Sequence, residues 1–396
     1  MDLLENLNPN QRKAVEHTEG PLLILAGAGS GKTRVITHRI AYLMREKRVS
    51  PYRIFAVTFT NKAAEEMRKR VIGLTGPEGT SVFMKTFHSA SVYILRRFGE
   101  RIGIEKNFSI YDQGDQEQVI KGILEKMRID PKKVKPSSIA SKISEIKDKA
   151  DLVDGARLDL LLPDYYAFDF QELYREYHQR LRQNNALDFN DLIIKTVELL
   201  RNDAPTLGEL QSRWQYFMID EYQDTNHAQY LMALLLSSQS RNICVVGDDD
   251  QSIYSWRGAD IRNILDFEKD YDDARVITLD ENYRSRQPIL DSASHVIRNN
   301  VHRKEKNLKA CKGEGEPVVW CRANNEYGEA EYVVSTMQTL KSREGFHNRD
   351  FAVFYRTNAQ SRVFEDVLRR NNIPYRVVGG LKFYDRREIK DMLAYL

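Results

Sequence analysis

Eight consecutive residues near the amino terminus have the types and spacing of a phosphate-binding loop: Ala26-Gly27-Ala28-Gly29-Ser30-Gly31-Lys32-Thr33. They follow an apolar run and open a helical pattern, as such a loop requires, although Ala26 replaces the usual first glycine. Glycines let backbone N–H groups curl around phosphates, and the positive end of the helix adds to the attraction. We expect residues 28–31 to cradle the phosphates of ATP, Lys32 to reach the β- and γ-phosphates, and Thr33 to ligate Mg²⁺.

A second chemical signal is the pair Asp220 and Glu221, which directly follows the apolar residues 217–219. Asp220 stands where an acidic group holds Mg²⁺, and Glu221 where one orients or deprotonates the attacking water. Taken alone, such an acidic pair after a strand caps a helix about as often as it serves in catalysis. Together with the phosphate loop, it predicts nucleotide hydrolysis rather than transfer to a bulky acceptor.

Two further polar residues are weaker candidates when taken alone. Arg284, in the string Glu281-Asn282-Tyr283-Arg284-Ser285, is a candidate for the cation that neutralises charge on the transferring phosphoryl group. Gln11 carries an amide that suits the edge of adenine. For both, a plain surface position is the more common explanation of an isolated residue of that type.

A parallel sheet would bring these residues together. Apolar, β-branched runs alternate with helical stretches, and each run is followed by polar residues. In an open α/β sheet, the ligand site lies at the carboxyl ends of the strands. We therefore predict an α/β fold with buried parallel strands at 21–27, 53–60, 81–88, 217–221, 243–248 and 276–279.

The hydrophobic pattern divides the rest of the chain into a helical segment and a second alternation of strands and helices. Residues 111–213 show helical periodicity with almost no strand signal, so they predict a helical insertion. After Tyr283 a second alternation predicts strands at 317–322, 351–356 and 375–378, with helices from Glu326 and Asn358. Residues 385–396 keep helical spacing up to Leu396 without a stop signal, which suggests a helix cut short.

Composition narrows the class of protein. A chain of 396 residues with 41% hydrophobic and 30% charged residues fits a soluble globular protein of two or three domains. No apolar run approaches the roughly 20 residues that span a bilayer, and the amino terminus does not resemble a signal peptide. We expect a cytoplasmic protein without a membrane partner.

Cysteine spacing and charge add little about ligands. The three cysteines are widely spaced and predict reduced thiols, rather than disulfides or a zinc site. The formal charge of +3 does not indicate a polyanionic partner. Residues 121–150 carry a net charge of +5, which fits either a nucleic-acid contact or a solvated helical face.

Several longer strings resemble the UvrD/Rep/PcrA helicases of superfamily one, and together they cover essentially the whole chain. After AGAGSGKT, the chain carries DEYQDT at 220–225, GDDDQSIYSWRGA at 247–259 and LDENYRS at 279–285. It also carries AVTFTNKAA at 56–64, TFHS at 86–89, LDFNDL at 187–192 and YRTNAQSR at 355–362. The resemblance implies RecA-like motor domains and ATP-driven 3′ to 5′ movement on single-stranded DNA and at duplex junctions. It also implies a role in DNA repair or replication, whose proteins are candidate partners.

The resemblance also assigns roles around the nucleotide. It implies that Gln11 contacts adenine, that Tyr283 stacks on it, and that Arg34 lies nearby. Gln251 would sense the γ-phosphate. Arg284 would act as an arginine finger from the second motor domain.

The string at 247–259 suggests how DNA and nucleotide are linked. Gln251 would face the phosphate while Tyr254 and Trp256 stack on bases, an interaction of about 1–3 kcal/mol per base that tolerates any sequence. By resemblance, Phe59 and His88 extend this DNA track and Arg257 contacts a phosphate. Taken alone, Phe59 and Trp256 would more often be core residues.

We expect four segments. They are a first RecA-like domain formed by 1–110 and 186–280, a helical insertion at 111–185, the first part of a second RecA-like domain at 281–384, and the start of a truncated helical region at 385–396. The family's later motifs, including a second arginine, have no counterpart before Leu396. We therefore expect this polypeptide alone to bind nucleotide, to hydrolyse ATP poorly and not to unwind duplex.

Two alternatives remain open. One is a nucleotide-gated, single-stranded-DNA-binding module without turnover, which differs from a motor in that DNA does not stimulate hydrolysis. The other is a P-loop phosphotransferase for small molecules. It is disfavoured because Phe59 and the aromatic residues of the 247–259 string have no evident use in such an enzyme.

Overall fold

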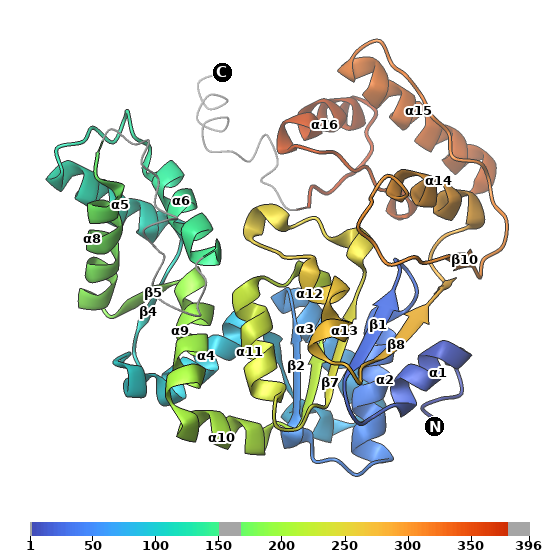
Figure 1. The fold of residues 1–396 in the computed structure, drawn as a ribbon. Coiled ribbons are helices and arrows are strands. Elements are labelled where there is room, and N and C mark those ends of the chain that lie inside the picture. Colours follow the sequence, from blue (N-terminus) through green and yellow to red (C-terminus); the bar gives the residue numbers. More distant parts are fainter. Residues whose placement is uncertain (1, 150–167, 379–396) are drawn as a thin grey trace. The chain divides into compact units, whose positions relative to one another are not determined.

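A parallel sheet of six strands forms the centre of residues 1–316. The computed structural model describes residues 2–149 and 168–378 (Figure 1). The strand order is β3-β2-β6-β7-β1-β8, and every neighbouring pair runs parallel. All six predicted strands form, with bounds β1 Leu22–Ala26, β2 Ile54–Thr58, β3 Phe83–Thr86, β6 Tyr216–Ile219, β7 Ile243–Gly247 and β8 Arg275–Leu279.

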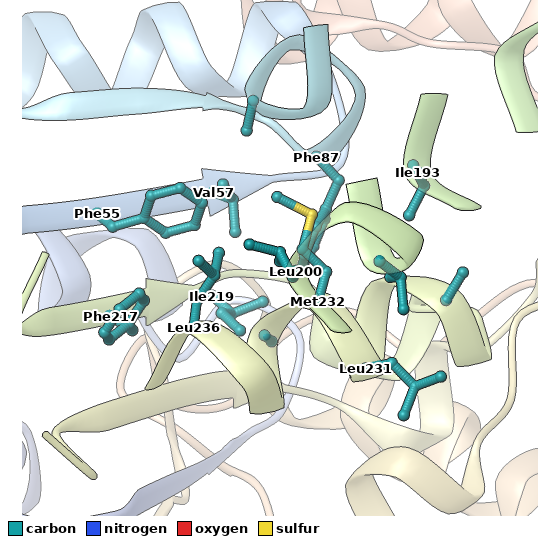
Figure 2. Close-up of a cluster of buried hydrophobic side chains, with 14 of the residues drawn as sticks. Phe55, Val57, Phe87, Ile193, Leu200, Phe217, Ile219, Leu231, Met232 and Leu236 are labelled. Atoms are coloured by element: carbon teal, nitrogen blue, oxygen red, sulfur yellow. The ribbon is translucent and has the colours of Figure 1, made fainter. Parts of the chain in front are cut away.

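The two faces of this sheet each bury a separate hydrophobic cluster, because side chains alternate along a strand. Leu23 and Leu25 of β1 enter one cluster, whereas Leu22 and Ile24 enter the other. Figure 2 shows the first cluster, in which Phe55 and Phe217 of neighbouring strands lie among side chains of the covering helices. Strands buried on both sides explain why the sequence shows continuous apolar runs instead of alternation.

Helices connect and cover the strands. Several begin at a polar residue that caps them, such as Thr60 before α3 and Thr86 before α4. The helices are α1 Pro9–Glu16, α2 Lys32–Arg45, α3 Asn61–Thr75, α4 Phe87–Phe98, α5 Gln113–Lys126, α6 Pro136–Lys149, α8 Phe170–Gln183, α9 Phe189–Asn202, α10 Ala204–Arg213, α11 His227–Ser237, α12 Arg262–Leu265, α13 Phe267–Asp270, α14 Gln287–Ile297, α15 Glu326–Glu344 and α16 Ser361–Arg370. No helix among the described residues is long and apolar enough to cross a membrane.

The predicted helical insertion has a hydrophobic cluster of its own. Its members come from α5, α6 and α8, with Ala186 from β5, and include Ile120, Ile143 and Tyr177. Two short strands missed by the sequence analysis, β4 Ser109–Tyr111 and β5 Ala186–Asp188, pair in parallel at its base. Helices α9 and α10, which the same helical pattern included, contribute instead to the cluster against the sheet.

Residues 281–316 group with the first compact unit, which comprises residues 1–316. They contain α14 and the short strands β9 Glu281–Asn282 and β10 Lys309–Ala310, which pair in parallel. The segment between α14 and β10 returns to the central sheet, where it reaches the nucleotide site described below.

The second compact unit comprises residues 317–396. Helices α15 and α16 form as predicted and share a small cluster that includes Val334 and Leu368. The strands predicted at 317–322, 351–356 and 375–378 do not form, which corrects the sequence analysis. An extended segment becomes a strand only by bonding to a neighbouring one, and these segments have no ladder partner among the described residues. The helix expected at 385–396 lies outside the described residues.

Candidate nucleotide site and DNA track

The phosphate loop joins β1 to α2 at the carboxyl edge of the sheet. Gly29 and Gly31 have φ of 72° and 93°, a left-handed conformation in which a side chain is strained. The Ser30 hydroxyl donates to the Gly27 carbonyl at 2.7 Å, which closes the loop on itself. Among the residues that the structure describes, no side chain caps α2, so its first backbone N–H groups have no side-chain acceptor there. The loop thus has the open donor arrangement that binds phosphate.

Lys32 and Glu221 meet across the site. The Lys32 ammonium lies 2.8 Å from a Glu221 carboxylate oxygen, which joins the start of α2 to the second residue after β6. Glu221 has a positive φ of 53°, which turns the chain sharply after the strand. The structure therefore brings together two of the predicted catalytic residues that are far apart in sequence.

Asp220 is the buried carboxylate of this site. Burial, then the neighbouring Glu221, raises the pKa of Asp220 to about 7, although Lys32 acts in the opposite direction. A carboxylate and a hydroxyl, as supplied by Asp220 and Thr33, are the hard oxygen donors that Mg²⁺ prefers. A buried carboxylate with a raised pKa also suits a nearby cation, which would stabilise its charged form. Among the described residues, no three acidic, histidine or cysteine side chains form a metal site by themselves.

Gln223 was missed by the sequence analysis. It links the loop after β6, which carries Glu221, to the loop after β7, which carries Asp248. It is buried, donates to Glu221 at 3.0 Å, and accepts from the backbone N–H of Asp248 at 3.0 Å. Gln251 follows shortly after and donates from Nε2 to Asp248 Oδ2 at 2.6 Å. The Gln251 loop is therefore connected to Glu221 by hydrogen bonds. Only its position within the string 220–225 pointed to Gln223.

Gln11 lies against the phosphate loop, not on the surface. It is 1% exposed, and its Nε2 donates to the Ser30 carbonyl at 2.9 Å. Its other amide atom accepts from the Asn8 backbone, in the capping box at the start of α1. The buried Arg39 of α2 donates to the Ala14 carbonyl at 2.9 Å and so fixes α1 against α2.

Tyr283 reaches the same helix end. Its backbone N–H donates to the Gly29 carbonyl at 3.0 Å, and its hydroxyl accepts from Asn8 Nδ2 at 3.0 Å. The hydroxyl also donates to Glu281, and burial together with this carboxylate raises the pKa of Tyr283 to about 12. The ring is 39% exposed. Tyr283 and Gln11, the two residues expected to contact adenine, thus lie around one loop.

Arg284 is placed beside the phosphate loop by Asn282, a second residue that the sequence analysis missed. Asn282 is buried, donates to the Ala28 carbonyl, and accepts from the Arg284 backbone N–H at 2.9 Å. A Cβ on Gly29 would lie 2.6 Å from the Cβ of Arg284. Arg284 is itself exposed, and Arg34 is half-buried in the first turn of α2.

Three of the predicted DNA-track aromatics form one row. Phe59, just after β2, stacks on Tyr254 with ring centres 5.1 Å apart and planes 19° from parallel. Tyr254 lies 6.3 Å from Trp256, and Trp256 is 72% exposed, which excludes a core position. The Arg257 backbone belongs to the same 3-10 turn, Ser255–Arg257, and its side chain lies outside the described residues.

His88, another predicted track residue, lies at the start of α4. Its ring meets Phe189 edge-on, with centres 5.8 Å apart, and burial lowers the pKa of His88. Phe189 is 47% exposed although it is a large apolar residue. It is a further candidate for the track, and its place in the LDFNDL string was the only sequence signal for it.

Comparisons with known proteins match the chain to two family models and to several named relatives. The family model described as the UvrD/REP helicase N-terminal domain matches residues 7–272, and that of the UvrD-like helicase C-terminal domain matches residues 277–396. The chain is 51% identical over 394 residues to the ATP-dependent DNA helicase PcrA of Bacillus subtilis and covers 53% of that protein. It is 50% identical to the proteins of the same name from Staphylococcus aureus and Staphylococcus epidermidis, and covers 54% of each. The chain thus spans about half the length of these relatives.

Proposed function

The chain belongs to the UvrD/Rep family of helicases, and we propose that it forms the ATP-binding part of a motor that moves 3′ to 5′ along single-stranded DNA and separates strands at duplex junctions. The observation that carries this proposal is the loop 247–259. Its Gln251 is hydrogen-bonded into the nucleotide site, and its Tyr254 stacks on Phe59. A nucleotide hydrolase without a polymer track has no use for such a row of aromatics.

ATP would bind with its phosphates over residues 28–31 and its adenine between Gln11 and Tyr283. Lys32, which pairs with Glu221 at 2.8 Å, would turn to the β- and γ-phosphates, since these carry more negative charge than one carboxylate. Glu221 is then free to orient and deprotonate the attacking water. Thr33 and Asp220 would hold Mg²⁺, which neutralises phosphate charge when bound. Arg284 would stabilise the charge that develops on the transferring phosphoryl group.

Coupling to DNA would pass through the same short loop. Gln251 senses the γ-phosphate, and a shift of its loop moves Tyr254 and Trp256 by way of the intervening turn. Bases stacked on these rings and on Phe59 would then be released or gripped in step with hydrolysis. His88 and Arg257 complete the proposed track.

The proposed domain division is a first RecA-like domain at 1–110 and 186–280, a helical insertion at 111–185, the first part of a second RecA-like domain at 281–384, and the start of a helical region at 385–396. We further propose a cytoplasmic role in DNA repair or replication, because a DNA motor acts where the chromosome is. Repair and replication proteins are its candidate partners.

The test is the steady-state ATPase rate of the full-length protein with and without single-stranded DNA, beside a strand-separation assay on a duplex with a 3′ tail and one with a 5′ tail. We expect strong stimulation by DNA and unwinding of the 3′-tailed duplex only. Nucleotide-dependent DNA binding without turnover would support the gated-module alternative. An ATPase rate that does not change when DNA is added would contradict the proposed motor function.

A further inference from the structure

Residues 303–310, which we call the strap, cross the nucleotide site after α14. At one end, the strap contacts the three aspartates that follow β7. In the middle, Leu308 covers Gly27, where an added Cβ would lie 2.5 Å from the leucine side chain. At the other end, β10 pairs with β9, next to Tyr283 and Arg284. One short segment thus contacts the phosphate loop, the loop that carries Gln251, and β9, which directly precedes Tyr283 and Arg284.

Lys306 is the buried centre of the strap. Its ammonium lies 3.1 Å from Asp248 and 3.3 Å from Asp250, and it also pairs with Asp249. Its side chain is 2% exposed. Burial opposes its charge, but the three carboxylates outweigh burial and raise the pKa of Lys306.

Two other cations of the strap, Arg303 and Lys304, do not duplicate this role. Arg303 forms a two-pronged contact with Asp250, at 2.8 Å for each nitrogen. Lys304 contributes its backbone N–H to Asp249, while its ammonium pairs with Glu268. Lys306 is therefore the strap cation within ion-pair distance of Asp248 in the part of the chain that the structure describes.

Asp248 transmits this contact to the nucleotide site. One of its carboxylate oxygens binds Lys306, and the other accepts the amide of Gln251 at 2.6 Å. Its backbone N–H donates to Gln223, which in turn binds Glu221. A carboxylate held from one side by a buried cation keeps a fixed direction toward the group that it binds on the other side.

We propose that Lys306 is a positioning residue for ATP hydrolysis, which acts by fixing the Asp248 carboxylate and through it the amide of Gln251. This inference rests on the proposed role of Gln251 at the γ-phosphate. Lys306 itself would not contact the nucleotide. Its loss leaves three carboxylates close together, with Arg303 at Asp250 as the remaining strap cation that the structure pairs with them. Repulsion between the carboxylates would then turn Asp248 and release Gln251.

The test compares K306M with K304M in the full-length protein. The two lysines belong to the same strap, and K304M removes only the ammonium that pairs with the half-exposed Glu268. We expect K306M to lower DNA-stimulated kcat about 10- to 100-fold, the range expected for a small displacement of a catalytic group. We expect its KM for ATP and its binding of a fluorescent ADP analogue to stay within about twofold of wild type, since uniform binding is not affected. K304M should keep wild-type kcat, and K306R should recover part of the loss.

A double-mutant cycle shows whether Lys306 acts through Gln251. If it does, K306M/Q251A should hydrolyse ATP no more slowly than Q251A, whereas independent effects multiply. Effects that multiply, or a wild-type kcat in K306M, overturn the proposal.

If K306M fails to fold, D248N takes its place, because it removes the charge at constant shape. It should show the same loss of kcat, and a wild-type rate in D248N overturns the proposal as well. A wild-type protein whose hydrolysis ignores DNA would instead reject the proposed motor and leave the cycle interpretable from basal turnover.

Discussion

Asp220→Asn should stabilise the nucleotide-free protein while it removes a proposed ligand of Mg²⁺. Asp220 is 5% exposed, and its pKa is raised to about 7 from the 3.8 of a free aspartate. A raised folded-state pKa means that the unfolded chain loses this proton first, so ionisation favours unfolding. This loss of stability begins as pH rises through the pKa of Asp220 in the unfolded chain, and it is complete above the pKa of Asp220 in the folded protein. Asparagine does not ionise and avoids it.

The size of the effect follows from the two pKa values. A shift of about 3 units is worth about 4 kcal/mol at pH 8, because each unit is about 1.4 kcal/mol. At pH 5.5 the same linkage gives about 2 kcal/mol, since the free carboxylate is ionised there and the buried one is not. The stability gap between D220N and wild type should therefore widen by about 2 kcal/mol from pH 5.5 to pH 8.

Urea unfolding at the two pH values, without nucleotide or Mg²⁺, measures this gap. D272N is the matched control, because the Asp272 side chain is 99% exposed. The control should show no widening. A D220N gap that stays constant or narrows as pH rises would refute the reasoning about Asp220. D220N should also lose ATP turnover. This result would separate the effect of Asp220 on the stability of the protein from its proposed role in binding Mg²⁺.

Three further predictions concern binding. K32A should abolish binding of a fluorescent ATP analogue and leave single-stranded-DNA affinity nearly unchanged; unaltered ATP affinity would contradict the phosphate-loop assignment. W256A should weaken single-stranded-DNA binding by about 1–3 kcal/mol in a fluorescence-anisotropy titration, whereas W320A, which removes another exposed tryptophan, should not. G29A should weaken nucleotide binding, because its φ is 72° and its Cβ would collide with Arg284; calorimetry that gives the wild-type affinity would contradict this close approach.

Much of the fold could be predicted because it depends on local pattern. Strands buried on both faces must be continuous apolar runs, and all six runs became neighbours in one parallel sheet. The strands predicted after residue 316 failed for the opposite reason. Their apolar residues fit a strand, but strand formation needs a partner that a local pattern does not specify.

For the site, the sequence by itself determined which chemical groups are available, since the glycines, Lys32 and the acidic pair have a spacing that few other uses require. Only the tertiary structure decided how they are held. Gln11, which taken alone would more often be a surface residue, is buried against Ser30. Nothing in the sequence around Gln223, Asn282 or Lys306, apart from the family strings that hold the first two, pointed to their contacts. Their roles arise from contacts between segments far apart in the chain, and such contacts depend on how the sheet and its loops pack rather than on spacing along the sequence.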